Sequence, residues 1–437
     1  MALNGRMTRR VVGMLEARLA EAGFGDIADP RKGGTKWSLD DLLKAAGLGI
    51  AAGCHSLAET ENLTDDISPA MRKRFGIFRR VPDTTMRDAF VKVEPEELRR
   101  SLARQVASAH RRKALVPHGL PFGVVGMDGK VTSIPAWDES YAQKQTHGEG
   151  MGAHGAVRMY TAALVSSRAV VCLDAPAIPS ATNEMGYFPK ALDCLVESYK
   201  GKQLFRLIAA DAGACSKANA EHVVDTHELD YLLALKMPQV ELWREATRLL
   251  ADRPPENADA TSEDVVGTAT LTRRVYITEE MAGYHDWEHL RVVLRIESER
   301  RDIKTGKVIE QKDEDVNRYY VCSLDRDELT DEQWLAVVRR YWGVENQCHH
   351  TWDTALREDA HPWILTKPQG TVVLMLLRRI VYNALALFRS VSLRSDERRE
   401  TPWKTLLRWS YNALIAARDS DLAGMRTRDA VVATHGI

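Results

Sequence analysis

The spacing of apolar residues divides the chain into helical ends and a strand-rich middle. Residues 8–115 repeat apolar side chains every three or four positions, as in "SLDDLLKAAGLGIAAG", where Ser38 is a candidate N-cap. A second helix is predicted to start at Pro95. The pattern after residue 390 is helical again. Both ends of the chain are therefore expected to be helical.

The middle of the chain alternates between strand and helix patterns. The runs "FGVVGMDGK" (122–130) and "QLFRLIAADAG" (203–213) are apolar and end in an aspartate and a tight turn, as buried strands do. Residues 156–175 predict a strand pair that turns at Ser166 and Ser167. Helical patterns follow in "NEMGYFPKALDCLVESYKG" and "SKANAEHVVDTH". This alternation predicts an α/β core with a partly parallel sheet.

A β-rich stretch and further helices complete the pattern. Residues 266–323 alternate in polarity and turn at "KTGK", which predicts antiparallel hairpins. Thr330 and Gln333 form a capping-box pattern ahead of "WLAVVRRYWGVENQCHHTWDTAL", which predicts a helix. The most apolar stretch, 371–388, is interrupted by Arg378 and Arg379. We therefore expect a buried helix there and not a membrane span.

Composition narrows the class of protein. The chain has 437 residues, enough for two or three packed units, with 44% hydrophobic and 28% charged residues. Sixty basic and 61 acidic side chains give a net charge of −1, so a nucleic-acid partner would need a local basic surface. Six cysteines without CxxC spacing, and a charged N-terminal segment without a secretory signal, favour a cytoplasmic protein.

Three acids are candidates for catalysis. Asp128 and Asp211 each end an apolar strand, and ligands of open α/β sheets bind at such strand ends. Two carboxylates at one edge repel each other unless they share a divalent cation such as Mg²⁺ or Mn²⁺. Glu345, on the helix after the β-rich stretch, is the natural third acid. The alternatives are that the aspartates are turn residues and the glutamate a surface charge.

Motifs along most of the chain resemble a known family. "VVGMDGK", "LIAADAGACSKANAEHVVDTHELDYLLALK" and "RRYWGVENQCHHTWDTALREDA" resemble, in this order, the three catalytic blocks of DDE transposases of bacterial insertion sequences, of the H-repeat-associated type in the insertion sequence 4 superfamily. "SATNEMGYFPKAL" resembles the family's Asn-Glu segment, and "RRVYITEE" resembles part of its β-insert. The resemblance spans roughly residues 28 to 390.

This resemblance implies an RNase H-like mixed-sheet α/β core with a β-rich insert between helical regions. The expected division is a DNA-end-binding helical region (1–118), the first part of the core (119–240), the insert (241–328), the second part of the core (329–390) and a helical C-terminal region (391–437). Asp128, Asp211 and Glu345 would be the DDE triad that holds two Mg²⁺ (or Mn²⁺) ions. The implied function is cutting of transposon ends and joining of their 3′-hydroxyls to target DNA.

The resemblance also implies partners and a location. The partners would be double-stranded DNA and a second copy of the chain in a synaptic complex, in the bacterial cytoplasm near the nucleoid, with no membrane involved. The rival hypothesis is a catalytically inactive DNA-binding protein derived from a transposase. One departure from the superfamily keeps that rival open: Val338, Tyr341 and Trp352 stand where its signature has Tyr, Arg and Lys. Arg339, Arg340 and Arg357 are possible substitutes. The presence of all three candidate acids favours the enzyme.

Other residues are candidates for auxiliary or DNA-binding roles. Asn346 is the residue after Glu345, and His349 and Asp353 lie four and eight residues after Glu345 on roughly the same helical face; an ordinary polar face is the alternative. "CHH" (348–350) is disfavoured as a zinc site because adjacent helical side chains point about 100° apart. Basic residues and one tryptophan are candidates for DNA contact, with surface or core positions as the alternative: Lys130, Lys236, Arg273, Arg274, Trp287, Arg72, Arg79 and Arg80.

Overall fold

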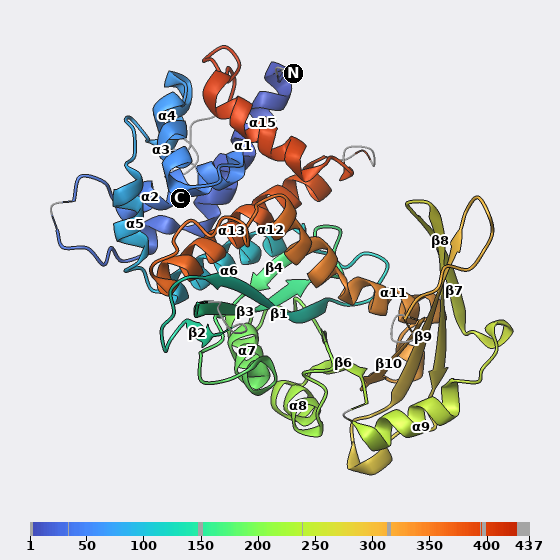
Figure 1. The fold of residues 1–437 in the computed structure, drawn as a ribbon. Coiled ribbons are helices and arrows are strands. Elements are labelled where there is room, and N and C mark those ends of the chain that lie inside the picture. The colour runs from blue at the N-terminus through green and yellow to red at the C-terminus, as the bar shows by residue number, and fades with distance from the viewer. Residues whose placement is uncertain are drawn as a thin grey trace.

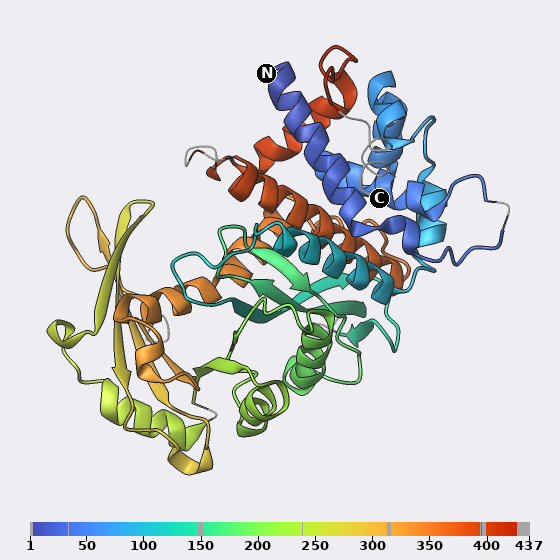
Figure 2. The same ribbon diagram turned by 180° about the vertical axis from the view of Figure 1, so that it is seen from behind.

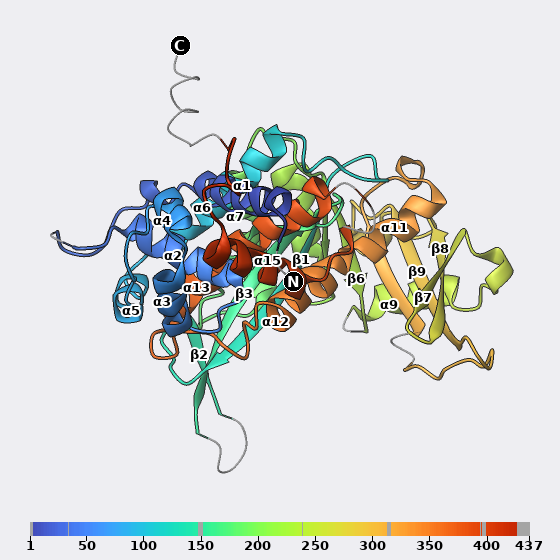
Figure 3. The same ribbon diagram turned by 90° about the horizontal axis from the view of Figure 1, so that it is seen from above.

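The fold is a mixed sheet between two helical layers, with an extension at one end (Figure 1). The computed structural model describes residues 3–33, 35–146, 152–237, 239–312, 316–393, 395 and 399–425. The helices of both chain ends cover one face of the sheet, and two crossover helices cover the other (Figures 1 and 2). Viewed from above, the extension lies at the opposite end of the molecule from the N-terminal helices (Figure 3).

The N-terminal helices form as their apolar spacing predicts. They are α1 (Gly5–Ala22), α2 (Leu39–Ala52), α3 (Leu57–Asp66), α4 (Pro69–Phe75), α5 (Asp83–Phe90) and α6 (Pro95–Arg111). Ser38 caps α2 by accepting a hydrogen bond from the Asp41 N–H at 3.1 Å, so the predicted cap is confirmed. The first residue of α6 is Pro95, also as predicted.

The C-terminal helices α13 (Pro368–Leu387) and α15 (Trp403–Ala416) pack with these N-terminal helices. Among the described residues, the helical stretch Pro368–Ser392 is long and apolar enough to span a membrane, but its most apolar window is entirely buried within the protein. The Asn383 side chain of α13 donates to and accepts from the backbone of Cys172 at 2.7 and 2.8 Å. These two hydrogen bonds hold α13 against the sheet at Cys172, as expected for a buried core helix.

Within the described ranges, the sheet contains ten strands. They are β1 (Val124–Ile134), β2 (Ala142–Gln145), β3 (His154–Leu164), β4 (Val171–Asp174), β5 (Leu207–Ala210), β6 (Asp230–Leu235), β7 (Ala260–Val266), β8 (Ala269–Thr278), β9 (Val292–Asp302) and β10 (Asn317–Cys322). The order is β2-β3-β1-β5-β6-β10-β9-β8-β7, and β4 pairs with β3.

The core strands have the RNase H-like arrangement. Strand β3 runs antiparallel to both β1 and β4, whereas β5 and β6 run parallel to β1. The helices α7 (Glu184–Ser198) and α8 (Lys217–Glu221) connect β4 to β5 and β5 to β6. The predicted α/β fold class, with its RNase H-like mixed sheet, is therefore confirmed.

The β-rich insert continues the core sheet and is not a separate one. It begins with α9 (Val240–Leu250), and its strands β7, β8 and β9 form antiparallel hairpins. The hairpin strands β8 and β9 fall in the stretch 266–323, as predicted, whereas β7 lies almost entirely before it. Strand β10 pairs with β9 on one side and with β6 on the other, antiparallel in both cases. Tyr320 of β10 is 1% exposed because core and insert pack together at this join.

The helix after the insert is interrupted where a continuous one was expected. Thr330 and Gln333 form the predicted capping box at the start of α11 (Asp331–Tyr341). A π-helical turn then spans Val344–His349, before α12 (His350–Thr354). Single π turns within helices are rare and frequent at functional sites. The remaining short turns are Phe24–Asp26, His222–Thr226, Pro255–Asn257, Tyr284–Asp286, Arg326–Glu328 and Phe388–Ser392.

Candidate active site

Asp128 and Asp211 lie side by side on neighbouring parallel strands. Met127 of β1 is paired in register with Ala210 of β5, and each aspartate is the next residue of its chain segment. The turn after β5 is fixed by the Gly213 N–H, which donates to Asp211 Oδ1 at 3.1 Å. The strand pairing brings the two acids together as predicted, and Asp211 directly follows the end of β5. The prediction that Asp128 ends its strand is wrong, because Asp128 and Gly129 lie within β1, where they pair with Thr161 and Tyr160 of β3.

Glu345 lies on the π turn that packs against β1. A close approach at Gly126 permits this packing, because a β-carbon there would lie 3.2 Å from the Tyr341 carbonyl oxygen and 3.4 Å from Val344 Cβ. Glu345 itself is exposed. Its charge contributes to raising the pKa of Asp128, so Glu345 acts electrostatically on the same site.

A fourth acid, Glu184, joins the three that the sequence suggested. Asn183 caps α7 by accepting from the Gly186 N–H at 2.9 Å, and Glu184 is the first residue of that helix. Its carboxylate lies directly over Gly129, where any β-carbon would overlap it. The Arg158 guanidinium donates to the carbonyls of Pro179 and Thr182 at 3.0 and 2.6 Å, which anchors this loop.

Sequence reasoning missed Glu184 as a site residue. The available signal was the Asn-Glu pair in "SATNEM" together with the glycine after Asp128. Neither feature shows by itself that a helix N-terminus will meet β1 at that glycine.

Two of these acids, Asp128 and Glu184, are destabilised in their ionised forms. Burial, together with the smaller effects of the charges of Asp211, Glu345 and Glu184, raises the pKa of Asp128 to about 8. Burial also raises the pKa of Glu184, with Asp211 contributing and Arg158 opposing. A cluster of carboxylate oxygens with this excess of negative charge suits a hard divalent cation such as Mg²⁺. The residues present therefore fit the metal that the resemblance implies.

His349 connects this cluster to β3. Its Nε2 atom lies 3.0 Å from Thr161 Oγ1, and its Nδ1 atom lies 3.5 Å from Asp128 Oδ2. Burial lowers the pKa of His349 to about 3, with further lowering by Arg379 and Lys130. The imidazole is therefore neutral at physiological pH, and it lies against the Asp128 carboxylate.

The "CHH" side chains point to different partners. Cys348 contacts the Tyr382 hydroxyl at 3.5 Å, His349 faces Asp128 and Thr161, and His350 is exposed. All six cysteines, each among the described residues, are free thiols. The geometry at 348–350 therefore does not assemble a three-ligand zinc site.

Lys130 is buried within the protein. Its ammonium donates to Asp353 at 2.7 Å and to Asp359 at 3.0 and 3.1 Å, and its side chain is only 5% exposed. Asp359 also accepts from the Thr132 hydroxyl. This placement argues against the predicted phosphate contact for Lys130 and gives Asp353 a structural partner. Asn346, beside Glu345, is exposed.

The arginines proposed as substitutes for the missing signature differ in surroundings. Arg339 forms an ion pair with Asp264 of the insert at 2.5 Å, and Arg340 donates to the Ser166 carbonyl at 2.9 Å. Arg357 is exposed and lines a cavity of about 740 Å³. Because Arg339 and Arg340 have these protein partners, Arg357 is the best placed of the three to meet a phosphate.

The insert residues named as DNA contacts are largely engaged within the protein. Arg273 pairs with Asp264 at 2.6 Å, and Arg274 lies 3.5 Å from Glu297. Trp287 is 8% exposed, which favours its alternative role as a core residue. Because of these contacts, the basic and aromatic residues of the insert expose less surface for DNA binding than the sequence suggests.

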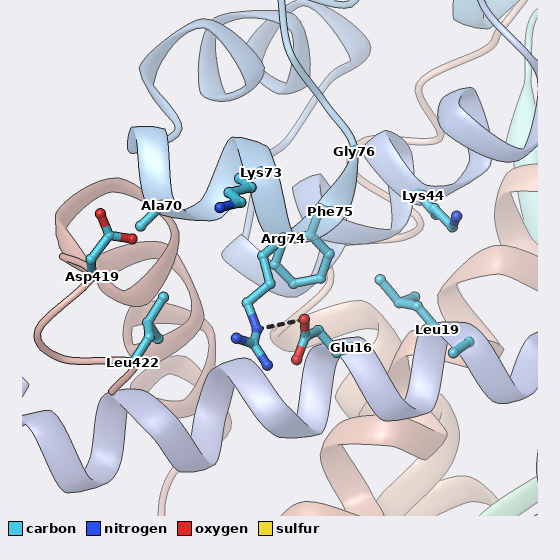
Figure 4. Close-up of a pocket in the computed structure, with 11 residues that line it drawn as sticks. Glu16, Leu19, Lys44, Ala70, Lys73, Arg74, Phe75, Gly76, Asp419 and Leu422 are labelled. Atoms are coloured by element: carbon cyan, nitrogen blue, oxygen red, sulfur yellow. Dashed lines mark ion pairs between the residues drawn. The ribbon is translucent and has the colours of Figure 1, made fainter. Parts of the chain in front are cut away.

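The N-terminal basic cluster is partly paired. Arg72 donates to the Ile67 carbonyl at 3.0 Å, Arg80 pairs with Glu61 at 2.7 Å, and Arg79 stacks over Trp37 at 4.7 Å. Figure 4 shows Arg74 directed at Glu16 across a cavity of about 520 Å³, with an ion-pair distance of 2.5 Å. Arg79 and Arg80 remain exposed, so a phosphate contact there is sterically open.

A second cavity adjoins Asp211 at the join between core and insert. Its volume is about 540 Å³, and its lining includes Asp211, Lys236, Arg318 and Trp342. The Arg318 guanidinium lies 4.3 Å from the centre of the Trp342 ring, and Lys236 is exposed. A cationic and aromatic lining next to the acids suits an unpaired nucleotide.

Of the known proteins compared with this chain, solved structures match it, whereas family models and curated proteins do not. No protein-family model and no curated protein matches the chain. Among solved structures, a piggyBac transposase synaptic complex with hairpin DNA, determined by cryo-EM, is similar with a TM-score of 0.43 and 10% sequence identity. The match covers 98% of this chain and 82% of that one.

Proposed function

We propose that the protein is a Mg²⁺-dependent DDE transposase of the insertion-sequence type, which cuts transposon ends and joins their 3′-hydroxyls to target DNA. The observation that supports this most directly is the placement of Asp211, Glu345 and Glu184 around Asp128, whose pKa is raised to about 8 by burial first and by these three charges in addition. The motif resemblance supplies the DNA substrate, and the RNase H-like strand order agrees with it.

In this proposal the four carboxylates hold and orient the reacting groups. Asp128 and Asp211 would hold the cations from the sheet, and Glu345 would close the site from the π turn. Glu184 approaches from the opposite layer, over Gly129. Two bound Mg²⁺ ions would activate the attacking oxygen and stabilise the leaving oxygen. His349 lies against the Asp128 carboxylate without adding a positive charge.

DNA is expected to reach the acids through the cavity beside Asp211. Lys236 would contact a phosphate there, and Trp342 with Arg318 would stack on an unpaired base. Arg357, Arg79 and Arg80 would contact phosphates farther along the duplex. A homodimer in the bacterial cytoplasm would bring two ends together in one complex.

The decisive experiment measures Mg²⁺-dependent nicking of DNA that carries the element's terminal inverted repeats. Wild type is expected to nick it, and Asp211→Ala to lose nicking while retaining DNA binding. His285→Asn is a matched control, because His285 is exposed and lies in the insert. DNA binding without nicking in the wild type would instead support the inactive DNA-binding protein.

A further inference from the structure

A second group of potential metal ligands lies outside the proposed active site. The Nε2 atoms of His222 and His227 lie 2.8 and 2.9 Å from the same oxygen of Asp193, Oδ1. The two imidazole rings are 4.9 Å apart between centroids and nearly perpendicular. Two nitrogens and one oxygen thus face a common point, and their atoms lie within 4.8 Å of one another.

A local change in helix type brings the side chains of His222 and His227 onto nearly the same side of the backbone. His222 and His227 are five residues apart, which in an α-helix would leave them about 140° apart around the axis. The helix changes at this point to a π-helical turn, His222–Thr226. Since a π turn closes bonds between residues five apart, it returns the sixth residue to nearly the same side. Both imidazoles therefore face Asp193 of α7.

We propose that Asp193, His222 and His227 form a binding site for a divalent transition-metal ion, with Zn²⁺ as the expected occupant. Imidazole nitrogen and carboxylate oxygen are ligands that Zn²⁺ binds at about 2.0–2.2 Å in tetrahedral geometry. Such geometry separates ligand atoms by slightly more than the present hydrogen bonds. The Asp193 side chain is 42% exposed and can rotate outward by that amount.

The site is open for an ion and for a fourth ligand. Asp193 and His227 line a surface cavity of about 600 Å³, so a metal-bound water would complete the coordination. His227 is the more buried of the two histidines, with 11% of its side chain exposed against 23% for His222. The more buried ligand, His227, would hold the ion in place. The ion would enter from the solvent past the more exposed Asp193 and His222.

A bound ion would join the two crossover helices of the core. Asp193 belongs to α7, and the histidines follow α8 in the connection to β6. Asp193 lies nine residues beyond Glu184, or about 13 Å along the helix at 1.5 Å per residue. The site is thus separate from the four acids, and its nitrogen ligands select a different metal. Its role would be to stabilise the core, independently of the proposed DNA chemistry.

The experiment titrates the full-length, metal-stripped protein with Zn²⁺, or with Co²⁺ as a spectroscopic probe, in excess Mg²⁺. Wild type and Asp211→Ala are expected to bind about one equivalent tightly and to gain thermal stability. His222→Asn and His227→Asn should each weaken this binding at least tenfold, roughly, and lose the gain in melting temperature. His285→Asn, an exposed histidine outside the site, should behave as the wild type.

Far-UV circular dichroism of the metal-free variants checks that each still folds, and Asp193→Asn provides a third variant on a different helix. The proposal is overturned if Zn²⁺ binding is absent, or equal in wild type and all three ligand variants. Loss of binding in Asp211→Ala with retention in the histidine variants would place the ion at the acidic cluster instead. These outcomes do not depend on whether the protein nicks DNA.

Discussion

The carboxylate of Glu184 lies over Gly129, in the space that any larger residue on β1 would need. The first residue of α7 and the residue after Asp128 are thereby linked, although 55 positions separate them in the sequence (184 minus 129). This contact brings the crossover layer into the acidic cluster. The contribution of Glu184 to the site can therefore be tested by two independent substitutions, one at each residue of this contact.

Gly129→Ala is expected to displace the Glu184 carboxylate while leaving the fold intact, because the overlapping atoms are the far end of a flexible side chain. Nicking should fall by about tenfold to hundredfold, since small misplacements of a catalytic group have effects of this size. Glu184→Gln should act in the same direction. The measurement is the single-turnover nicking rate as a function of Mg²⁺ concentration.

Gly152→Ala is the matched control, because a β-carbon there meets nothing within 4 Å. Equal nicking rates for Gly129→Ala and Gly152→Ala would show that Glu184 does not contribute to the site.

Asp128 should make the stability of the metal-free protein depend on pH. Its pKa is about 8 in the folded state against an ordinary 3.8, so the folded protein holds a proton that the unfolded chain releases. This stabilisation is complete below about pH 4 and is lost as the pH rises through about 8. His349 acts in the opposite sense. Its pKa falls from 6.5 to about 3, so its contribution is present above 6.5 and is lost as the pH falls toward 3.

Of these two groups only Asp128 still titrates above about pH 7, so its ionisation should lower the melting temperature in EDTA between about pH 7 and 9. Asp128→Asn should flatten this decline, and Mg²⁺ should reduce it because the cation stabilises the ionised carboxylate. Scanning calorimetry across this range provides the measurement. An unchanged decline in Asp128→Asn would assign the effect to another group.

Lys130 and Lys236 should respond differently to removal of their charge. Lys236→Ala is expected to weaken DNA binding and to make the dependence of log affinity on log salt shallower by about one unit. Lys130→Met should leave that slope unchanged and lower the melting temperature, because Asp353 and Asp359 lose their buried partner. Fluorescence anisotropy over a salt series distinguishes the two. A shallower dependence of log affinity on log salt in Lys130→Met would instead indicate that Lys130 contacts DNA.

Glu358 should be essential to the stability of the helical layer. Its side chain and that of Arg379 are fully buried and ion-paired, and the Arg379 guanidinium stacks over Trp352 at 3.8 Å. Glu358→Gln leaves a buried cation without its counter-charge, which costs about 3–5 kcal/mol. Urea denaturation measures the loss in free energy of unfolding.

Glu97→Gln is the control for Glu358→Gln, because its partner Arg100 is 59% exposed and such pairs contribute little. Similar losses for the two variants would contradict the importance of burial.

Local patterns predicted most of the secondary structure because its causes are local. The Ser38 cap, the Thr330–Gln333 capping box and the Pro95 start all formed as expected. The two apolar runs that end in Asp128 and Asp211 became adjacent strands of an RNase H-like sheet. The π turn at Val344–His349 was not predicted, because its cause is the packing of that helix against Gly126 and not its own sequence.

The sequence by itself determined the α/β class, the three candidate acids and their order along the chain. Only the tertiary structure decided which charged residues are available for function. Lys130 and Arg339 are occupied by protein partners, whereas Glu184 joins the acidic cluster from another layer. The physical reason is that local spacing fixes the face a side chain occupies, but burial, pKa and ion pairing depend on what distant segments bring to that face.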